Sequence, residues 1–304
     1  MESLRFIDLF AGVGGTRLAF ESQSFDCVFS SEWDLHARAT YQANFDDLPH
    51  GDITEIPAKH IPPFEVLVAG FPCQPFSTIG KQQGFKHETQ GTLFYEIARI
   101  LSETTPRAFL LENVKGLLTN NNGSTWNTIQ EVLSELGYFV KHAVLDSSDF
   151  GVPQRRRRLY VVGFRDPQDL ESFSFPVPTG DLADFAPHVE WGALGYSISK
   201  HLQSTYVFKL SDGRPEIVDQ GWTGPIKTLV SSYYKIQRLT GTFVRDGETG
   251  LRLLSRSECL AAMGFPSDFI LPQSRGRIYR QLGNSVAVPV VAAIAGQMSI
   301  ALRR

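Results

Sequence analysis

Cys73 carries the side chain of this sequence best suited to covalent chemistry. It stands in Gly-Phe-Pro-Cys-Gln-Pro-Phe-Ser, residues 70–77, shortly after the apolar run Val66–Ala69. Because that run predicts a buried strand, we expect Cys73 on the turn beyond its carboxyl end, where open α/β sheets bind their ligands. A thiol there could be a nucleophile, a metal ligand or filler.

Charged residues that would assist such a thiol stand at other predicted strand ends. Glu112 follows the apolar run Phe109–Leu111, and four arginines occupy 155–158. We expect Glu112 and Cys73 to face one crevice, and strand alternation puts Arg156 and Arg158 on one face. Nearby cations raise the thiolate fraction of a cysteine. Taken singly, Glu112 is better explained as an exposed loop acid and the arginines as a solvated basic turn.

A glycine-rich turn, Phe10–Gly15, separates the first predicted strand from a helix. Its glycines let the backbone approach a ligand and enter a helix amino terminus, although their spacing is not the dinucleotide fingerprint. Glu32 lies about twenty residues further on, where nucleoside-binding folds place the acid that holds ribose hydroxyls. Trp33 could stack on a purine, and Asp52 could contact its edge. A capping acid, a core tryptophan and a turn are the alternatives.

The elements that must position these residues alternate along the first part of the chain. We expect strands at Leu4–Phe10, Phe25–Ser30, Val66–Gly70, Ala108–Leu111, Val140–Leu145 and Leu159–Phe164. We expect helices at Arg17–Ser22, Asp34–Asn44, Leu93–Leu101 and Trp126–Leu136. This alternation predicts an α/β fold with a mostly parallel sheet covered by helices on both faces.

The rest of the chain has a different pattern. Residues 166–187 are rich in Pro, Asp and Phe and suggest a linker, and 188–250 predict a small, irregular β-rich domain with frequent turns. Residues 286–300 are apolar nearly all round, which predicts a helix buried on the first domain's sheet. We therefore expect a first domain at 1–185, a second at 186–276 and a segment at 277–304 that returns to the first.

Composition describes a globular protein without a membrane segment. The chain has 304 residues, of which 42% are hydrophobic and 20% charged, and three widely spaced cysteines. We find no signal peptide and no apolar run long enough to span a bilayer, and the cysteines suit a reducing cytoplasm. The net charge of −3 is unevenly spread. Basic residues concentrate at 155–158 and 200–256, and a local basic face can bind phosphates whatever the total charge.

In order and spacing these pieces resemble the DNA cytosine-C5 methyltransferases of bacterial restriction–modification systems. The matching segments are Phe6–Phe20, Glu32-Trp33, Gly51–Ile53, Gly70–Ser77, Gly91–Leu101, Glu112–Val114, Gln154–Tyr160, Arg252–Pro266 and Gln281–Val291. The combination of Pro-Cys-Gln, Glu-Asn-Val and Gln-x-Arg-x-Arg in this order is highly specific. One departure is Ser257, which stands where the family usually has Arg before Glu258 and which puts a contact supporting the small domain in doubt.

The resemblance implies a Rossmann-like sheet that binds S-adenosylmethionine, no metal, and a target-recognition domain at 186–276. The implied catalytic residues are Cys73, Glu112, Arg156 and Arg158. The implied cofactor residues are Phe10, Gly12, Gly14, Gly15, Glu32, Trp33, Asp52, Ile53, Pro72, Leu93, Asn284 and Val286. The Cys73 thiolate would add to carbon 6 of cytosine, and a protonated Glu112 would bridge ring nitrogen 3 and the exocyclic amine.

The implied substrate is double-stranded DNA, from which the target base must be flipped. A loop at 76–88 would close over that base. The residues expected to contact DNA are Ile79, Lys81, Gln82, Gln154, Thr228, Leu229, Lys235 and Arg238. The protein is expected to be a monomer in a bacterial cytoplasm, associated with the nucleoid, and a cognate restriction endonuclease acting on the same site is an expected partner.

Three other function classes share part of this pattern. A zinc cytosine deaminase needs Pro-Cys-x-x-Cys, but no second cysteine follows Cys73 at that spacing. A tRNA cytosine-C5 methyltransferase of the same fold shares Pro-Cys-Gln and Glu-Asn-Val and is the main alternative, although the long basic stretch 188–250 favours DNA. A non-catalytic DNA-binding relative is disfavoured because Cys73, Glu112 and Arg158 are all present.

Overall fold

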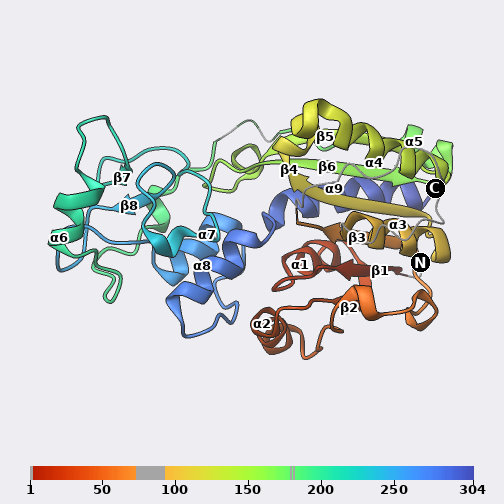
Figure 1. The fold of residues 1–304 in the computed structure, drawn as a ribbon, viewed down its shortest axis with the longest axis horizontal. Coiled ribbons are helices and arrows are strands. Elements are labelled where there is room, and N and C mark those ends of the chain that lie inside the picture. The colour runs from red at the N-terminus through yellow and green to blue at the C-terminus, as the bar shows by residue number, and fades with distance from the viewer. Residues whose placement is uncertain (1–2, 73–92, 179, 181) are drawn as a thin grey trace.

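A six-stranded sheet forms the larger of two lobes in the computed structural model, which describes residues 3–72, 93–178, 180 and 182–304. The strand order is β2-β1-β3-β4-β6-β5 (Figure 1). The strands are β1 Leu4–Leu9, β2 Phe25–Ser31, β3 Val66–Gly70, β4 Ala108–Val114, β5 Phe139–Asp146 and β6 Arg157–Phe164. The first four are mutually parallel, and β6 runs antiparallel to both β4 and β5. The mostly parallel sheet predicted from the sequence is therefore confirmed.

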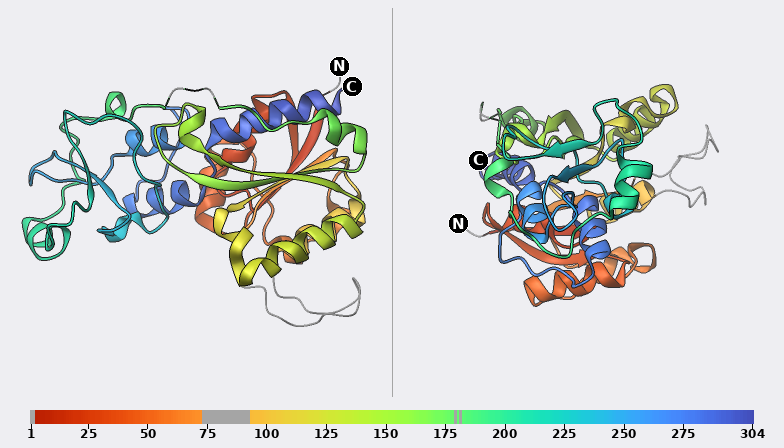
Figure 2. Two further views of the ribbon diagram at one scale, coloured as in Figure 1. Left: turned by 90° about the horizontal axis from the view of Figure 1, so that it is seen from above. Right: turned by 90° about the vertical axis from the view of Figure 1, so that its left-hand side faces the viewer.

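Helices cover both faces of this sheet. They are α1 Gly15–Glu21, α2 Leu35–Phe45, α3 Leu93–Thr104, α4 Ser124–Glu135, α5 Pro167–Ser172 and α9 Val288–Leu302. Figure 2 shows α9 along one face, with α4 on the opposite side. The segment predicted to be a linker is partly ordered by α5, because Phe173 just beyond this helix is fully buried in the core on the α9 side.

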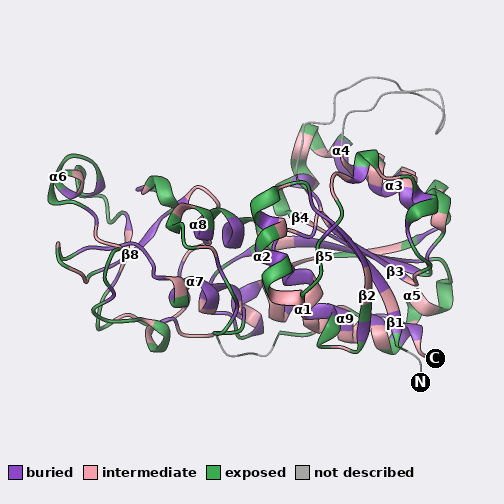
Figure 3. Cartoon of the chain, turned by 90° about the horizontal axis from the view of Figure 1, so that it is seen from below, coloured by how far each residue is buried: buried purple, intermediate pink, exposed green. Residues whose placement is uncertain are grey.

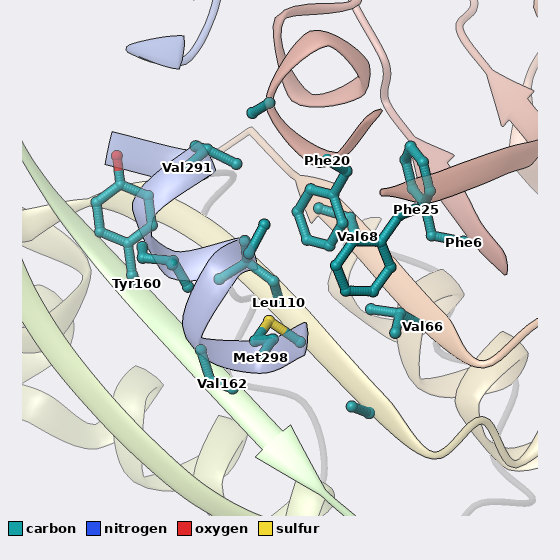
Figure 4. Packing of buried hydrophobic residues seen from close by; sticks show 14 of the residues in the cluster. Phe6, Phe20, Phe25, Val66, Val68, Leu110, Tyr160, Val162, Val291 and Met298 are labelled. Carbon is teal, nitrogen blue, oxygen red and sulfur yellow. The ribbon is translucent and has the colours of Figure 1, made fainter. Parts of the chain in front are cut away.

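The apolar character of α9 is explained by the surface on which it packs. Val291 and Met298 lie over side chains of β3, β4 and β6, while the rings of Phe6, Phe20 and Phe25 extend the same layer toward α1 (Figure 4). Burial of each such side chain contributes about 1.5–3 kcal/mol before entropy is counted. α9 therefore packs on one face of the six-stranded sheet.

On the opposite face, α3 and α4 pack against the alternate side chains of the same strands. Ile97 and Leu101 of α3, with Ile129 of α4, join Leu67 and Phe109 in a second core. The outward surfaces of these helices are exposed, whereas the strands between the layers are buried (Figure 3). Because strand side chains alternate, Glu112 points to the α9 face, as Leu110 does.

The small lobe has its own core and little regular structure. Its elements are α6 Lys200–Leu202, β7 Glu216–Val218, β8 Thr242–Val244, α7 Arg256–Met263 and α8 Arg275–Asn284. Although β-rich structure was predicted for residues 188–250, β7 and β8 are three residues each and are the only strands described there. Ile278, Tyr279 and Leu282 of α8 pack into this core. Gln281 of the same helix is hydrogen-bonded to Thr40 and His36 of α2, so α8 contacts both lobes.

A buried ion cluster organises the small lobe. Arg252 is fully buried and pairs with Glu258 at 2.8 Å and with Asp246 at 2.9 Å. Ser257, which stands where the family usually has arginine, donates to Glu190 Oε2 at 2.6 Å, and Glu190 N donates to Glu258 Oε1 at 2.8 Å. Ser257 is therefore connected to the same cluster through its hydrogen bond to Glu190.

By length and composition, the helical stretch Arg275–Leu302 is the one candidate membrane span among the described residues. Its helices α8 and α9 are separated at Ser285–Ala287, and 56% of its most apolar window is buried inside the protein. Since α9 packs on the sheet, the stretch is accounted for as core.

Candidate active site

Glu112 and Arg158 form an ion pair on the α9 face of the sheet. Glu112 lies within β4, rather than after its end as predicted, and is the register partner of Gly70 in β3 and Tyr160 in β6. Arg158 Nε lies 3.1 Å from Glu112 Oε1, and the two side chains are 16% and 15% exposed. Glu112 Oε2 lies 3.6 Å from where a Cβ on Gly70 would be. The carboxyl group therefore overlies the end of β3, and Cys73 comes three residues after Gly70 in the sequence.

The environment of Glu112 makes its carboxyl group a weaker acid than usual. Burial raises the pKa of this carboxyl group above its ordinary value, while the charges of Arg158 and then Arg156 oppose the rise. A carboxylic acid can donate a proton to a ring nitrogen, which a carboxylate cannot do. The pair can therefore supply a proton donor beside a fixed positive charge.

Asn113 fixes the turn that leads from β3 toward Cys73. Its buried side-chain amide donates to Phe71 O at 2.9 Å, and Pro72, the next residue, is exposed. Cys73 itself lies outside the described residues, as do Ile79, Lys81, Gln82 and the predicted loop at 76–88. The described part of the chain thus ends at Pro72, one residue before Cys73, and resumes at Leu93.

Arg156 is buried beside this pair but binds the protein backbone. It is 4% exposed, and its guanidinium donates to the carbonyl oxygens of Leu229, Gly283 and Ser285. Burial, followed by the charge of Arg158, lowers its pKa to about 10, so it remains charged near neutral pH. Its position supports a structural contribution more directly than contact with a substrate.

The glycine turn is bonded to Glu32. The Glu32 carboxylate accepts from Gly12 N at 2.8 Å and from Asp34 N at 2.8 Å. Burial raises the pKa of this carboxyl group, and the backbone donors partly oppose this rise. Phe10 and Gly12 both have positive φ, 58° and 57°. The turn, the end of β1 and the end of β2 therefore form one unit.

Open space lies beside Gly12, the residue whose backbone N–H binds Glu32. A Cβ on Gly12 would meet nothing within 4 Å, whereas one on Gly14 would strike the Phe45 ring at 2.2 Å and one on Gly15 would lie 2.6 Å from Ser285 Oγ. Gly14 and Gly15 are thus required for packing, and Gly12 leaves a surface free. Trp33, which follows Glu32 in the sequence, is 73% exposed, which rules out the alternative of a core tryptophan.

The other predicted cofactor residues lie at ends of elements. A bridge between Ser31 and His50 brings the segment before Asp52 beside the end of β2. Asp52 caps its own turn by accepting from Thr54 N, and Ile53 is buried. Leu93 is half-buried at the start of α3, Asn284 is exposed at the end of α8, and Val286 is buried after it.

Several residues predicted to contact DNA are engaged with protein instead. Gln154 is fully buried, donates to Ala262 O and accepts from Leu229 N. Leu229 is 2% exposed, and Arg238 is 3% exposed and donates to Val207 O and Leu210 O. For these three residues the prediction of direct contact with DNA is corrected, because each is at most 3% exposed.

The remaining candidates in the small lobe are accessible. Lys235 is exposed, and Thr228, half-buried, donates to Arg155 O at 2.6 Å. Tyr234, which sequence reasoning missed, is 37% exposed, with Lys235 Nζ 5.8 Å and the Arg280 guanidinium 5.9 Å from its ring centre. The signal available in the sequence was an aromatic residue next to a lysine, but the second cation comes from α8. Among the described residues, no group of His, Cys, Asp or Glu is arranged to hold a metal ion.

Comparison with known proteins shows the family of this chain. The profile of C-5 cytosine-specific DNA methylases matches residues 4–299. Type II methyltransferase M.MspI of Moraxella sp. is 54% identical over 299 residues, which are 98% of this chain and 71% of that protein. Type II methyltransferase M.BsuFI of Bacillus subtilis is 55% identical over 296 residues, 97% of this chain and 72% of that protein.

Solved structures share the fold at lower identity. A mutant of Spodoptera frugiperda DNMT2 superposes with a TM-score of 0.80 at 22% identity and covers 98% of this chain and 100% of that one. S. pombe Dnmt2 superposes with a TM-score of 0.79 at 21% identity and covers 99% and 100%. The two-lobed arrangement of this chain is thus found in both.

Proposed function

The chain belongs to the C-5 cytosine-specific DNA methylase family, and from this we propose that it transfers a methyl group from S-adenosylmethionine to carbon 5 of cytosine in double-stranded DNA. It has the α/β methyltransferase fold. The observation that supports the chemistry best is the Glu112–Arg158 ion pair over the end of β3, the strand that leads into Pro72-Cys73. We assign residues 186–276 as the target-recognition domain.

In the proposed mechanism Cys73 is the nucleophile. Carbon 5 of cytosine is a weak nucleophile, and addition of a thiolate to carbon 6 places electron density on it. The positive charge of Arg158 near the end of β3 supports thiolate formation. Once carbon 5 carries the methyl group, its proton passes to solvent and the electron pair re-forms the carbon 5–carbon 6 double bond. The sulfur leaves as the thiolate and nitrogen 3 returns its proton to Glu112, which restores the aromatic ring.

Glu112 supplies the proton that this addition requires. As the sulfur adds, negative charge develops on the ring, and a protonated Glu112 donates to nitrogen 3 and accepts from the exocyclic amine. The same pair of bonds discriminates cytosine from thymine, which has a carbonyl oxygen in place of the amine. Burial raises the pKa of Glu112, which assists this proton donation, and the ion pair with Arg158 orients the carboxyl group.

The residues around the glycine turn fit a nucleoside. Glu32 presents a buried carboxylate, Gly12 leaves open space, and Trp33 exposes its ring. We propose that Glu32 binds the ribose, that Trp33 stacks on the adenine, and that Asp52, Ile53, Leu93 and the segment Asn284–Val286 enclose it. When bound, S-adenosylmethionine supplies an electrophilic methyl group on a sulfonium.

Transfer of labelled methyl from S-adenosylmethionine to duplex DNA tests this proposal. Purified protein is expected to label DNA, and bisulfite sequencing of DNA from cells that express it gives the modified sequence. Labelling of tRNA and not of DNA would overturn the DNA assignment. We also propose that the protein acts as a monomer near the bacterial nucleoid, beside a cognate restriction endonuclease.

Replacing Glu32 with alanine is expected to weaken cofactor binding more than DNA binding. Loss of hydrogen bonds to a charged group costs about 1.5–3 kcal/mol each, roughly ten- to a hundredfold in Kd. Calorimetric titration with S-adenosylhomocysteine measures the first loss, and a duplex titration measures the second. Glu131→Ala is the control, since Glu131 is an exposed acid on α4, a helix that has no part in the proposed cofactor site. Equal losses for both ligands would count against the ribose assignment.

The cluster of Tyr234, Lys235 and Arg280 is expected to bind the DNA backbone. Its two cations come from the small lobe and α8 and flank one exposed ring. Removing one phosphate contact reduces the slope of log affinity against log salt by about one. We expect Lys235→Ala and Arg280→Ala each to show this reduction in fluorescence titrations of duplex DNA. Lys59→Ala, on the exposed surface of the sheet lobe, is expected to leave the slope unchanged.

A further inference from the structure

Arg156 joins three parts of the chain that are distant in sequence. Its Nη1 donates to Leu229 O at 3.2 Å in the small lobe. Its Nη2 donates to Gly283 O at 3.1 Å and to Ser285 O at 2.6 Å, on either side of Asn284. One buried guanidinium therefore holds the recognition segment and the segment that closes the cofactor site.

Backbone hydrogen bonds next to Arg156 add to this connection between the small lobe and the start of β6. Arg155 N donates to Ile226 O at 2.8 Å, and Ile226 N donates to Pro153 O at 3.0 Å, so the small lobe adds a bridge along residues 153–155. Gln154 accepts from Leu229 N as well. Residues 226–229 cannot shift without disturbing the start of β6.

The end of α8 also packs closely against the backbone that follows Leu229. A Cβ on Gly283 would lie 2.3 Å from Ser231 N and 2.4 Å from Val230 C. The end of α8 therefore touches the backbone directly after Leu229. Movement of either segment must be transmitted to the other, because no side chain separates them.

Arg156 makes no ion pair with any described residue, although it is nearly fully buried. Its charge is met by carbonyl oxygens, and its Nε has no hydrogen-bond partner there. A buried cation without a counter-ion is costly. The planar fork of arginine can reach separate acceptors in a fixed geometry, which the single ammonium of lysine cannot reproduce.

We propose that Arg156 is a positioning residue that couples DNA binding by the small lobe to closure of the cofactor site. The inference rests on the proposed function. Thr228 and Leu229 lie on the recognition side of the guanidinium, and Asn284 and Val286 lie on the cofactor side. A ligand that fixes one side lowers the cost of ordering the other, which is a coupling free energy between two sites.

The coupling is measured as the ratio of two dissociation constants. S-Adenosylhomocysteine is titrated into the protein alone and into the protein saturated with a duplex that the wild-type enzyme methylates. We expect DNA to tighten binding in the wild type by at least about fivefold, the lower end of common couplings. In Arg156→Lys, which keeps the charge and loses the fork, the ratio is expected to fall close to one.

Arg238→Lys is the matched control. Arg238 is also a buried guanidinium that donates to two carbonyl oxygens, Val207 O and Leu210 O. Unlike Arg156 it also pairs with a carboxylate, Asp212, but all three partners lie within the small lobe. This variant is expected to lose thermal stability and to keep the wild-type ratio. If Arg156→Lys fails to fold, Gln154→Met removes the neighbouring bond to Leu229 without changing charge and is expected to lower the ratio.

The outcomes separate this inference from the proposed function. A wild-type protein that methylates DNA and shows a ratio of one overturns the coupling and leaves the function intact. An unchanged ratio in a folded Arg156→Lys variant also overturns it. An equal fall of the ratio in Arg238→Lys overturns it as well, since the loss of coupling would then result from general destabilisation of the protein. Absence of DNA methylation by the wild type contradicts the proposed function instead.

Discussion

Replacing Cys73 with alanine is expected to abolish methyl transfer to double-stranded DNA, by at least about four orders of magnitude, the usual cost of removing a covalent nucleophile. Without the thiolate, carbon 5 gains no electron density and the methyl group has no acceptor. Incorporation of labelled methyl into a duplex measures the loss. Thermal unfolding checks that the variant is folded.

Cys27 supplies the matched control for this experiment. Burial raises the pKa of its thiol to about 12, so it stays protonated and unreactive near neutral pH. Cys27→Ala is therefore expected to retain methyl transfer. A duplex with 5-fluorocytosine should trap the wild-type enzyme covalently, because fluorine cannot leave carbon 5 as a proton does. Wild-type rates in Cys73→Ala would refute the covalent mechanism.

Replacing Glu112 with glutamine is expected to lower kcat by about 10²–10⁴-fold, the usual range for loss of a general acid. Glutamine has nearly the same shape and can still lie beside Arg158, but it has no proton to transfer to nitrogen 3. Since binding contacts largely remain, the change should appear in kcat more than in KM. Steady-state methylation of a duplex provides both constants.

The pH dependence of the rate gives an independent check on Glu112. Burial raises the pKa of this carboxyl group, so its active, protonated form persists above the ordinary range and is lost as pH rises through the raised pKa. The wild-type rate is expected to fall along that limb, and Glu112→Gln is expected to lack it. Glu131→Gln, at an exposed position of α4, should keep the wild-type profile. A profile shared by all three proteins would exclude Glu112 as the titrating group.

The sequence was sufficient to predict the positions of residues that depend on the local backbone. Apolar runs ending in Gly70 and Leu111 predicted neighbouring strands, and parallel pairing then placed Glu112 beside the end of β3. Periodicity placed α9 on the sheet, because a helix that is apolar all round has no solvent face. The glycine turn and Glu32 were predicted from the same strand-to-helix logic.

Roles that depend on distant partners could not be predicted. Gln154 and Arg238 have the side chains of DNA-binding residues, but both are bound to carbonyl oxygens of their own protein. Nothing in the sequence indicated that Arg156 meets Gly283 and Ser285, or that Arg280 meets the ring of Tyr234. Composition reports the polarity of a side chain, and only the fold decides whether protein or solvent satisfies it.

The position of α9 determines when the sheet lobe can be completed during synthesis. The ribosome releases β1 to β6 first, then the whole small lobe, and only afterwards the helix that covers one face of the sheet. Until then Val68, Leu110 and Val162 face water, and the segment around Val286 is missing from the site. Although domains generally fold from the amino terminus as they emerge, this lobe must wait for its partner to be made. A nascent chain that already contains Cys73 and Glu112 therefore still lacks the helix that covers one face of its sheet.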